Sequence, residues 1–155
     1  MTDPAPGPRA SPEYLHEIVA PSSDVDDLGH VSNVAIVRWV QEAALAHSAA
    51  VGWDFEAYLE LGAVFVIRRI EIDYLRPAFA GDRIHLTTWV EGWKGASSVR
   101  RTRIVRGSDG LELARAKVQW AMVDLATGRP RRIPPEMGVA FAVDPYSVAG
   151  PRRAP

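Results

Sequence analysis

Apolar residues follow two different periods along this chain, one helical and one typical of strands. From residue 34 to residue 51 almost every side chain is apolar, and Gly52 then provides a usual helix-ending position. Ser32 or Asn33 can act as the N-cap, so we expect a helix of about 27 Å that begins there and ends near Val51. A helix that is apolar around most of its circumference must be buried on nearly every side, so we expect a sheet that curls around it.

The regions on either side of this helix alternate apolar and polar residues with the period of two that indicates strands. The clearest hairpin turn contains Asp109-Gly110, a dipeptide that accepts positive φ angles. We place another turn at residues 92–95, a short amphipathic segment at 53–61, and the end of regular structure at 133–135. One strand, one buried helix and four strands joined by short turns predict an α+β fold with an antiparallel sheet. The predicted strands span residues 14–20, 64–75, 84–91, 97–106 and 111–124.

The chain of 155 residues is long enough for one domain with a substantial core. Its beginning is rich in proline and small polar residues and has little apolar surface to bury. We therefore assign residues 1–12 to a disordered N-terminal tail, residues 13–142 to the folded domain, and residues 143–155 to a loose C-terminal tail.

Composition and charge exclude several classes of protein. Apolar residues make up 47% of the chain, which excludes a disordered or fibrous protein, and the formal net charge of −1 provides no long-range attraction to nucleic acid or anionic lipid. The absence of cysteine excludes a disulfide scaffold and a thiolate nucleophile. No apolar run reaches the roughly 18 residues of a membrane span, and the N-terminus lacks the apolar centre of a signal peptide. We therefore expect a cytoplasmic protein that binds neither membranes nor nucleic acid.

An acidic turn, residues 24–30, directly precedes the predicted helix. It contains Asp24, Asp26 and Asp27, followed by Gly29 and His30. The first turn of a helix has backbone N–H groups without intrahelical partners and carries partial positive charge. A developing oxyanion can be held at that position while a carboxylate acts beside it. The same pattern also occurs in ordinary turns, where Asp caps and hydrogen-bonds locally.

The sequence DVDDLGHVSN followed by WVQEA resembles the signature of the 4-hydroxybenzoyl-CoA thioesterase-like family, a branch of the hotdog-fold acyl-CoA thioesterases. The resemblance continues through IEIDYLRPAFAGD and through the late strand with D-x-x-T-G-R-P and Ile-Pro, so it covers about residues 14–135. The D-x-D-x-x-G motif alone has low specificity. The ordered set of matching features is what supports the resemblance.

This resemblance implies a hotdog fold, in which an antiparallel sheet wraps around one long central helix, and an acyl-CoA thioesterase with active sites between the subunits of a dimer or tetramer. It implies that Asp26 is the catalytic carboxylate, as nucleophile or general base, and that the backbone N–H of Asn33 donates to the oxyanion. His30 matches a histidine that also occurs in related acyl-carrier-protein thioesterases, and Gly29 would permit a tight turn near the thioester. Many members have an aromatic residue in the first turns of the central helix, where this chain has Val34-Ala35-Ile36, and Val34 is a candidate contact for the acyl group.

Several of these residues keep a second interpretation. Asp26 can be a turn residue, and His30 can hydrogen-bond the thioester carbonyl, orient water, or serve only as a turn histidine. The other two aspartates of the acidic turn are assigned structural roles. Glu42 follows Arg38 by one helical turn, which predicts an ordinary ion pair.

The basic residues are almost all arginine, and Lys94 and Lys117 are the only lysines. The basic residues Lys94 and Arg129 are candidate contacts for the coenzyme A phosphates, and arginine in particular suits bidentate binding of phosphate. A compositional bias or a solvated strand face explains the same residues without a ligand. The wider set of candidates is Arg100, Arg101, Arg103, Arg106, Arg131 and Arg132. The large aromatic residues expected in the core or at an interface are Trp39, Phe65, Trp89, Trp93 and Trp120.

The sequence shows no serine or cysteine route to thioester hydrolysis, since it contains neither a G-x-S-x-G elbow nor a cysteine. The histidines lack metal-ligand spacing, so we expect no metal and no cofactor other than the coenzyme A of the substrate. Two alternative functions remain open. One is a non-catalytic hotdog protein that binds acyl thioesters, and the other is an acyl-acyl-carrier-protein thioesterase.

Overall fold

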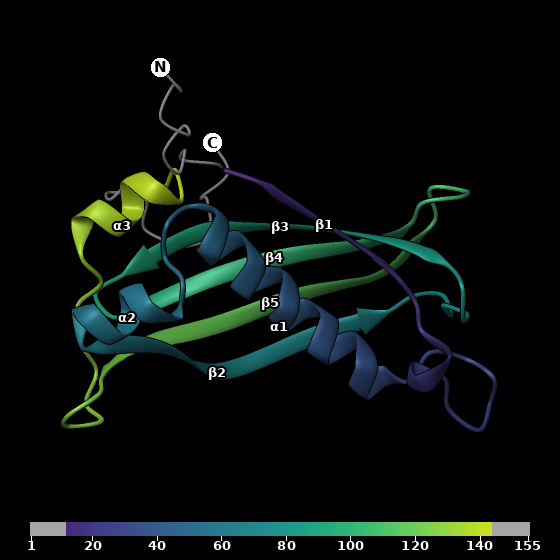
Figure 1. Cartoon of the computed structure of the whole chain (residues 1–155), viewed down its shortest axis with the longest axis horizontal. Coiled ribbons are helices and arrows are strands. Elements are labelled where there is room, and N and C mark those ends of the chain that lie inside the picture. The colour runs from purple at the N-terminus through teal and green to yellow at the C-terminus, as the bar shows by residue number, and fades with distance from the viewer. Residues whose placement is uncertain (1–11, 144–155) are drawn as a thin grey trace, which may run out of the picture.

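A computed structural model describes residues 12–143 of the protein (Figure 1). Five strands and three α-helices follow one another along the chain, with one turn of 3₁₀ helix after the first strand. The elements in order are β1 (Tyr14–Val19), η1 (Ser22–Asp24), α1 (Asn33–Ala50), α2 (Phe55–Leu61), β2 (Ala63–Tyr74), β3 (Arg83–Lys94), β4 (Ser97–Arg106), β5 (Glu112–Asp124) and α3 (Pro135–Ala140).

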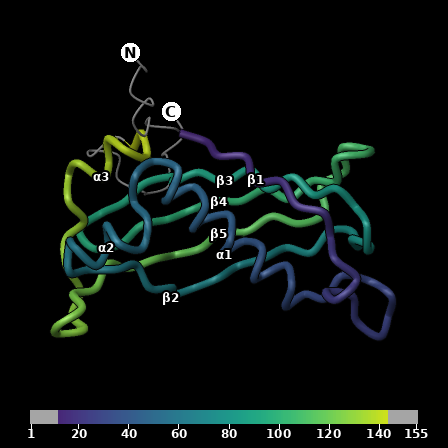
Figure 2. The backbone as a smooth tube through the Cα atoms, viewed as in Figure 1, coloured from purple at the N-terminus to yellow at the C-terminus, as the bar shows by residue number. Residues whose placement is uncertain are grey.

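The five strands form one antiparallel sheet in the order β1-β3-β4-β5-β2. The hairpins β3–β4 and β4–β5 form the centre of the sheet. Strand β2, which follows α1 and α2 in the chain, pairs with β5 at one edge (Figure 2). Within the described chain, β1 and β2 are therefore the two edge strands. The long edge of β2 remains open to pairing with another strand.

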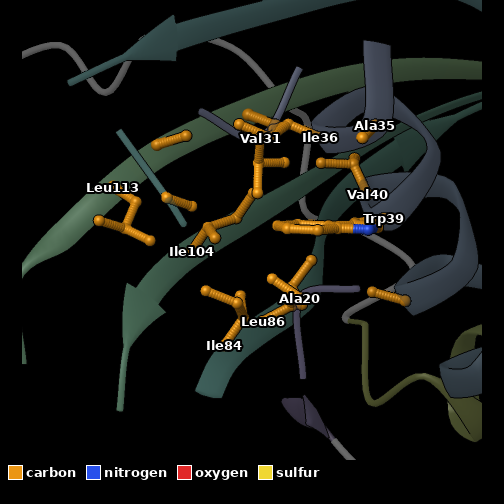
Figure 3. Close-up of a cluster of buried hydrophobic side chains, with 14 of the residues drawn as sticks. Ala20, Val31, Ala35, Ile36, Trp39, Val40, Ile84, Leu86, Ile104 and Leu113 are labelled. Carbon is orange, nitrogen blue, oxygen red and sulfur yellow. The ribbon is translucent and has the colours of Figure 1, made fainter. Parts of the chain in front are cut away.

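Helix α1 lies across one face of this sheet and supplies five of the fifteen buried residues of the main core (Figure 3). Ala35, Trp39 and Ala43 follow the helical period and point towards the sheet, where Ile84 and Ile104 are fully buried. Burial of a large side chain such as Ile84 or Ile104 contributes about 1.5–3 kcal/mol, and the small alanines let the helix approach the sheet closely.

The expected burial of α1 on nearly every side is wrong for the single chain. The side chains of Val34 and Leu45 are 78% and 64% exposed, and Arg38, Glu42 and Ala49 continue the same exposed stripe. The sheet covers one side of the helix, so the apolar residues of the opposite side remain uncovered within one chain. Exposed apolar side chains such as Val34 and Leu45, on the same helix face as the Arg38–Glu42 ion pair, are typical of an interaction surface.

Most of the predicted boundaries agree with the structure to within a residue or two, and β5 is the longest strand, as expected. Two predictions at the C-terminal side are wrong. The turn expected at residues 92–95 is displaced, because β3 continues to Lys94 through a bulge between Val90 and Gly92. Regular structure does not end at residue 135, because Pro135 occupies the first turn of α3, where a missing N–H costs nothing. The predicted tails lie almost entirely outside the described residues.

The two ends of α1 lie near opposite ends of the molecule and beside different elements (Figure 1). At one end, the start of α1 lies beside the end of β2, where the Tyr74 hydroxyl donates to the Asn33 carbonyl at 3.2 Å. At the other end, α2 and α3 lie near the β3–β4 turn, and Ile133 N–H donates to the Gly95 carbonyl at 2.9 Å. The 18 residues of α1 separate these ends by about 27 Å.

Candidate active site

The acidic turn folds back on itself and ends at the first residue of α1. A bridge between Val25 and Val31 closes it, and Asp26 N–H donates to the His30 carbonyl at 2.8 Å. Ser32 N–H donates to the Asp24 carbonyl at 2.9 Å, which ties the helix start to the beginning of the turn. These backbone bonds hold the turn in one conformation relative to the helix.

Asp26 lies on the exposed side of this turn. Its Oδ1 accepts the Leu28 N–H at 2.9 Å, while Gly29 completes the turn at a φ of +80°. A residue with a side chain is strained at that angle, so glycine is needed there for conformational reasons. The carboxylate of Asp26 therefore has a defined orientation and remains accessible to solvent and substrate in the single chain.

Asp24 has a structural role, as its sequence position suggested. Its side chain is buried, accepts the Trp39 indole N–H at 3.0 Å and forms an ion pair with Arg38. Arg38 also contacts Glu42 at 3.3 Å, so the helical ion pair expected from the sequence is present. Two hydrogen bonds to a single carboxylate thus connect the acidic turn to the middle of α1.

The start of α1 has free backbone donors. The Ser32 hydroxyl caps the helix by accepting the Ala35 N–H at 3.1 Å. Among the described residues, the N–H groups of Asn33 and Val34 have no hydrogen-bond partner. Both residues are exposed and follow Asp26 by seven and eight positions. The helix therefore presents unpaired donors with partial positive charge beside the acidic turn.

His30 is half-buried at the base of the turn. Its ring packs edge-on against Phe79 at 5.3 Å between centroids, and Phe79 in turn lies under the guanidinium of Arg106. The contact with Phe79 restricts the orientation of the imidazole.

The predicted phosphate-binding residues are far from the acidic turn of their own chain. Lys94 ends β3 and Arg129 follows β5, so both lie at the α2 end of the molecule (Figure 1). Both are exposed. The structure thus brings together Asp26, Gly29, His30, Asn33 and Val34, and places the two basic candidates at the opposite end.

The wider set of arginine candidates divides among different surroundings. Arg101 pairs with Glu91 on the uncovered face of the sheet, and Arg106 is held by Asp82 and Asp109. Arg100 is different, because it points to the helix-covered face and is only 6% exposed. Burial lowers the pKa of Arg100 to about 10, so it still carries its charge at neutral pH.

A cavity of about 300 Å³ lies at the α2 end, between the second half of α1, α2 and the sheet. Arg100 is the charged residue of its lining, and Ser48, Tyr58 and Ser98 contribute hydroxyl groups. The rest of the lining is largely apolar, including Leu45, Phe55, Phe65, Val90, Trp93, Trp120 and Phe141. Small-molecule sites begin at about this volume and typically combine apolar walls with a few polar groups.

Sequence reasoning missed this cavity. Phe65, Trp93 and Trp120 were expected in the core or at an interface, and all three do belong to or pack against the buried clusters, but they also line the cavity. Alternation along β4 does place Arg100 on the same face as the buried Ile104. However, each face of β4 carries both apolar and arginine side chains, with Val99 and Arg101 on the face opposite Arg100, so the period of two does not indicate which face is covered.

One long helix packed on a five-stranded antiparallel sheet, with a carboxylate turn at the helix start, defines a hotdog-fold protein of the thioesterase class. The model of the thioesterase-like superfamily matches residues 20–141, and the chain belongs to this superfamily.

Individual relatives agree with this assignment. The chain is 29% identical over 119 residues to the acyl-CoA thioesterase YbgC of Haemophilus influenzae, covering 76% of this chain and 86% of that protein. It is 29% identical over 120 residues to a chloroplastic palmitoyl-acyl carrier protein thioesterase of Arabidopsis thaliana, covering 73% of this chain and 28% of the plant protein. The crystal structure of a 1,4-dihydroxy-2-naphthoyl-CoA thioesterase from Synechocystis superposes with a TM-score of 0.77 at 18% identity, covering 84% of this chain and 96% of that one.

Within the described part of the chain, no helix is long and apolar enough to cross a lipid bilayer.

Proposed function

We propose that this protein hydrolyses acyl-CoA thioesters to a free carboxylic acid and coenzyme A, with Asp26 as the catalytic carboxylate. The observation that carries this proposal is the junction of the acidic turn with α1. There an exposed, oriented carboxylate lies in the same short segment as the unpaired N–H groups of Asn33 and Val34. The relatives named as acyl-CoA thioesterases support the same reaction.

In the proposed mechanism, the thioester carbonyl oxygen accepts hydrogen bonds from the start of α1. These bonds strengthen as negative charge develops on that oxygen in the tetrahedral intermediate. Asp26 either removes a proton from the attacking water or attacks the carbonyl carbon itself, forming a mixed anhydride that water then cleaves. In both routes the C–S bond breaks and coenzyme A leaves. Water and acyl-CoA are the only reactants, so we propose that no metal or further cofactor takes part.

We propose that the complete site is formed by two chains. Within one chain, the acidic turn and the basic residues Lys94 and Arg129 lie at opposite ends of α1. Antiparallel pairing of two β2 edges would place the end of one β2 beside the start of the other. The cavity and basic residues of one chain would then approach the acidic turn of its partner, and the exposed stripes of the two α1 helices would cover each other.

In this arrangement, Lys94 and Arg129 would bind coenzyme A phosphates, while Gly29, His30 and Val34 would surround the thioester. The proposed assembly is a homodimer, or a tetramer built from such dimers. We further propose a cytoplasmic location, with acyl-CoA as the partner and no binding of nucleic acid or membrane, consistent with the net charge of −1.

The direct test is release of free thiol from a panel of acyl-CoAs by the parent protein and by Asp26→Asn. On the best substrate, we expect the substitution to lower kcat by about 10²–10⁴-fold, because the amide can neither accept the proton from water nor attack the carbonyl. KM should change little. Asp27→Asn, an exposed neighbour in the same turn, is the matched control and should retain activity within about twofold.

Equal hydrolysis by the parent and Asp26→Asn would show that the site is elsewhere. A protein that binds acyl-CoA without turning over any member of the panel would instead be a non-catalytic binder. The similarity to the plant acyl carrier protein thioesterase makes carrier-bound substrates part of the panel. A clear preference for the carrier-bound form would change the assigned substrate but not the reaction.

A further inference from the structure

The cavity at the α2 end contains a buried charge that the proposed hydrolysis does not use. Arg100 lies on the covered face of β4, in a lining made mainly of aliphatic and aromatic side chains. A charged group in such surroundings is costly unless it is paired with an opposite charge. The neighbours of Arg100 therefore decide what the cavity can bind.

Arg100 has neutral partners but no carboxylate partner among the described residues. Its Nη1 group donates to His47 Nδ1 at 3.0 Å and to Thr88 Oγ1 at 3.1 Å. Because a guanidinium only donates, His47 Nδ1 must accept. The Nε and Nη2 groups have no hydrogen-bond partner in residues 12–143. The guanidinium also lies over the ring of Phe141, at 5.6 Å from its centroid.

The cavity lining holds a second unpaired donor. The Nε1 of Trp120 is buried and has no hydrogen-bond partner in the described part of the chain. The hydroxyl groups of Tyr58 and Ser48 are different, because they hydrogen-bond each other at 2.7 Å and Ser48 also donates to the Trp53 carbonyl. The third hydroxyl group of the lining, on Ser98, can both donate and accept. The guanidinium and the indole N–H can only donate, and the guanidinium is cationic.

A purely hydrocarbon ligand would displace water from the cavity and leave the guanidinium of Arg100 and the indole N–H of Trp120 without acceptors. A buried donor without a partner is unfavourable, and an unpaired cation is more so. An anionic oxygen would accept from both the guanidinium and the indole, and a carboxylate matches the planar fork of arginine. The surrounding apolar side chains would hold the aliphatic part of the same ligand.

We infer that the cavity binds the far end of an acyl group that carries a terminal carboxylate, and that Arg100 determines this specificity. The inference rests on the proposed function, because it names the preferred substrate of that hydrolysis. This substrate is a dicarboxylic acid with one carboxyl group joined to coenzyme A as a thioester. The thioester would lie near the cavity mouth at Leu45 and Phe55, where the acidic turn of a paired chain would approach. Arg100 is a specificity residue in this proposal and takes no part in bond cleavage.

The test compares two acyl-CoAs of equal chain length that differ only at the far end, hexanoyl-CoA and adipoyl-CoA, together with the longer pair octanoyl-CoA and suberoyl-CoA. For at least one pair, the parent protein should have a kcat/KM at least about tenfold higher for the carboxylate-ended substrate. Arg100→Met should reduce that preference by about 10- to 100-fold, mainly by slowing the carboxylate-ended substrate, while the methyl-ended substrate is hydrolysed as before or faster.

Two further variants keep this test independent of folding. Trp120→Phe retains the aromatic packing but removes the unpaired N–H, so it should reduce the preference by a smaller factor. Arg115→Met removes an arginine on the uncovered face of the sheet, where it pairs with Glu112, and should leave the preference unchanged. If Arg100→Met does not fold, the result for Trp120→Phe decides the proposal.

The outcomes separate this inference from the proposed function. Hydrolysis of both types of substrate with equal kcat/KM, or an unchanged preference in Arg100→Met, would overturn the inference while leaving thioester hydrolysis intact. If no substrate is turned over, calorimetric binding of adipoyl-CoA and hexanoyl-CoA replaces the kinetic readout, with the same expected preference and the same loss. A preference for 4-hydroxybenzoyl-CoA over all four substrates would overturn the assignment to a carboxylate.

Discussion

Asp24 and Asp26 lie two residues apart in one turn, but their carboxylates have different surroundings. Asp24 is buried against α1 and accepts from Trp39 and Arg38, whereas Asp26 accepts only a local backbone N–H and stays exposed. The structural role of Asp24 was expected from the sequence. The catalytic role of Asp26 stays a prediction, because the structure shows its accessibility and not its chemistry.

At the residue scale, Asp24→Ala tests the structural role. The substitution leaves the buried Trp39 Nε1 without an acceptor, while the half-exposed Arg38 can turn to solvent. We expect the free energy of unfolding to fall by about 1–3 kcal/mol, measured by urea denaturation with an unchanged m-value. Asp27→Ala, which removes an exposed carboxylate from the same turn, should change it by less than about 0.5 kcal/mol. Equal stability of parent and Asp24→Ala would show that these hydrogen bonds contribute nothing.

At the element scale, the sequence predicted both limits of α1 well, because capping and helix-ending residues lie next to the helix in the chain. Ser32 was one of two N-cap candidates, and the structure assigns the cap to it. Local signals failed where a distant contact sets the limit. β3 extends beyond Val90 because β4 pairs with its last residues. α3 is stabilised because Met137 and the following Phe141 belong to a buried cluster with residues from other elements, such as Trp93 and Met122.

The cap provides a test at this scale. Ser32→Ala removes the acceptor for the Ala35 N–H, and we expect a loss of about 0.5–2 kcal/mol in the free energy of unfolding. Ser32→Asp supplies another acceptor and should retain most of the parent stability. Both are measured by urea denaturation. If Ser32→Ala and Ser32→Asp lose equal stability, the side-chain hydrogen bond is not what holds the start of α1.

At the scale of the whole molecule, the main result is the separation of functional groups between two ends. The acidic turn is at one end of α1, and the cavity with Lys94 and Arg129 is at the other. One chain therefore contains both parts of the proposed acyl-CoA site, the acidic turn and the cavity with its basic residues, but holds them at opposite ends. The open edge of β2 and the exposed stripe of α1 provide the surface on which a second chain could complete the site.

Leu45→Glu tests this arrangement, because Leu45 is 64% exposed on the α1 stripe. A buried carboxylate without a partner would weaken the proposed dimer, so we expect the dissociation constant to rise at least tenfold, measured by analytical ultracentrifugation. Thioesterase activity should fall as the dimer dissociates. Leu15→Glu introduces the same charge on β1, at the opposite edge of the sheet, and should leave the dimer intact. A fully active monomeric parent would rule out a shared site.

The sequence alone determined the acidic turn, α1, α2 and the approximate positions of the five strands, because periodicity, capping and turn residues act between neighbours in the chain. It did not determine α3 or the end of β3. The hotdog fold and the thioesterase class were predicted from the resemblance and are confirmed. Only the tertiary structure decided that Arg100 faces the cavity and that the acidic turn and the basic residues lie apart. Both depend on which face of the sheet α1 covers and on the direction in which each strand returns, and these are set by packing between segments distant in sequence.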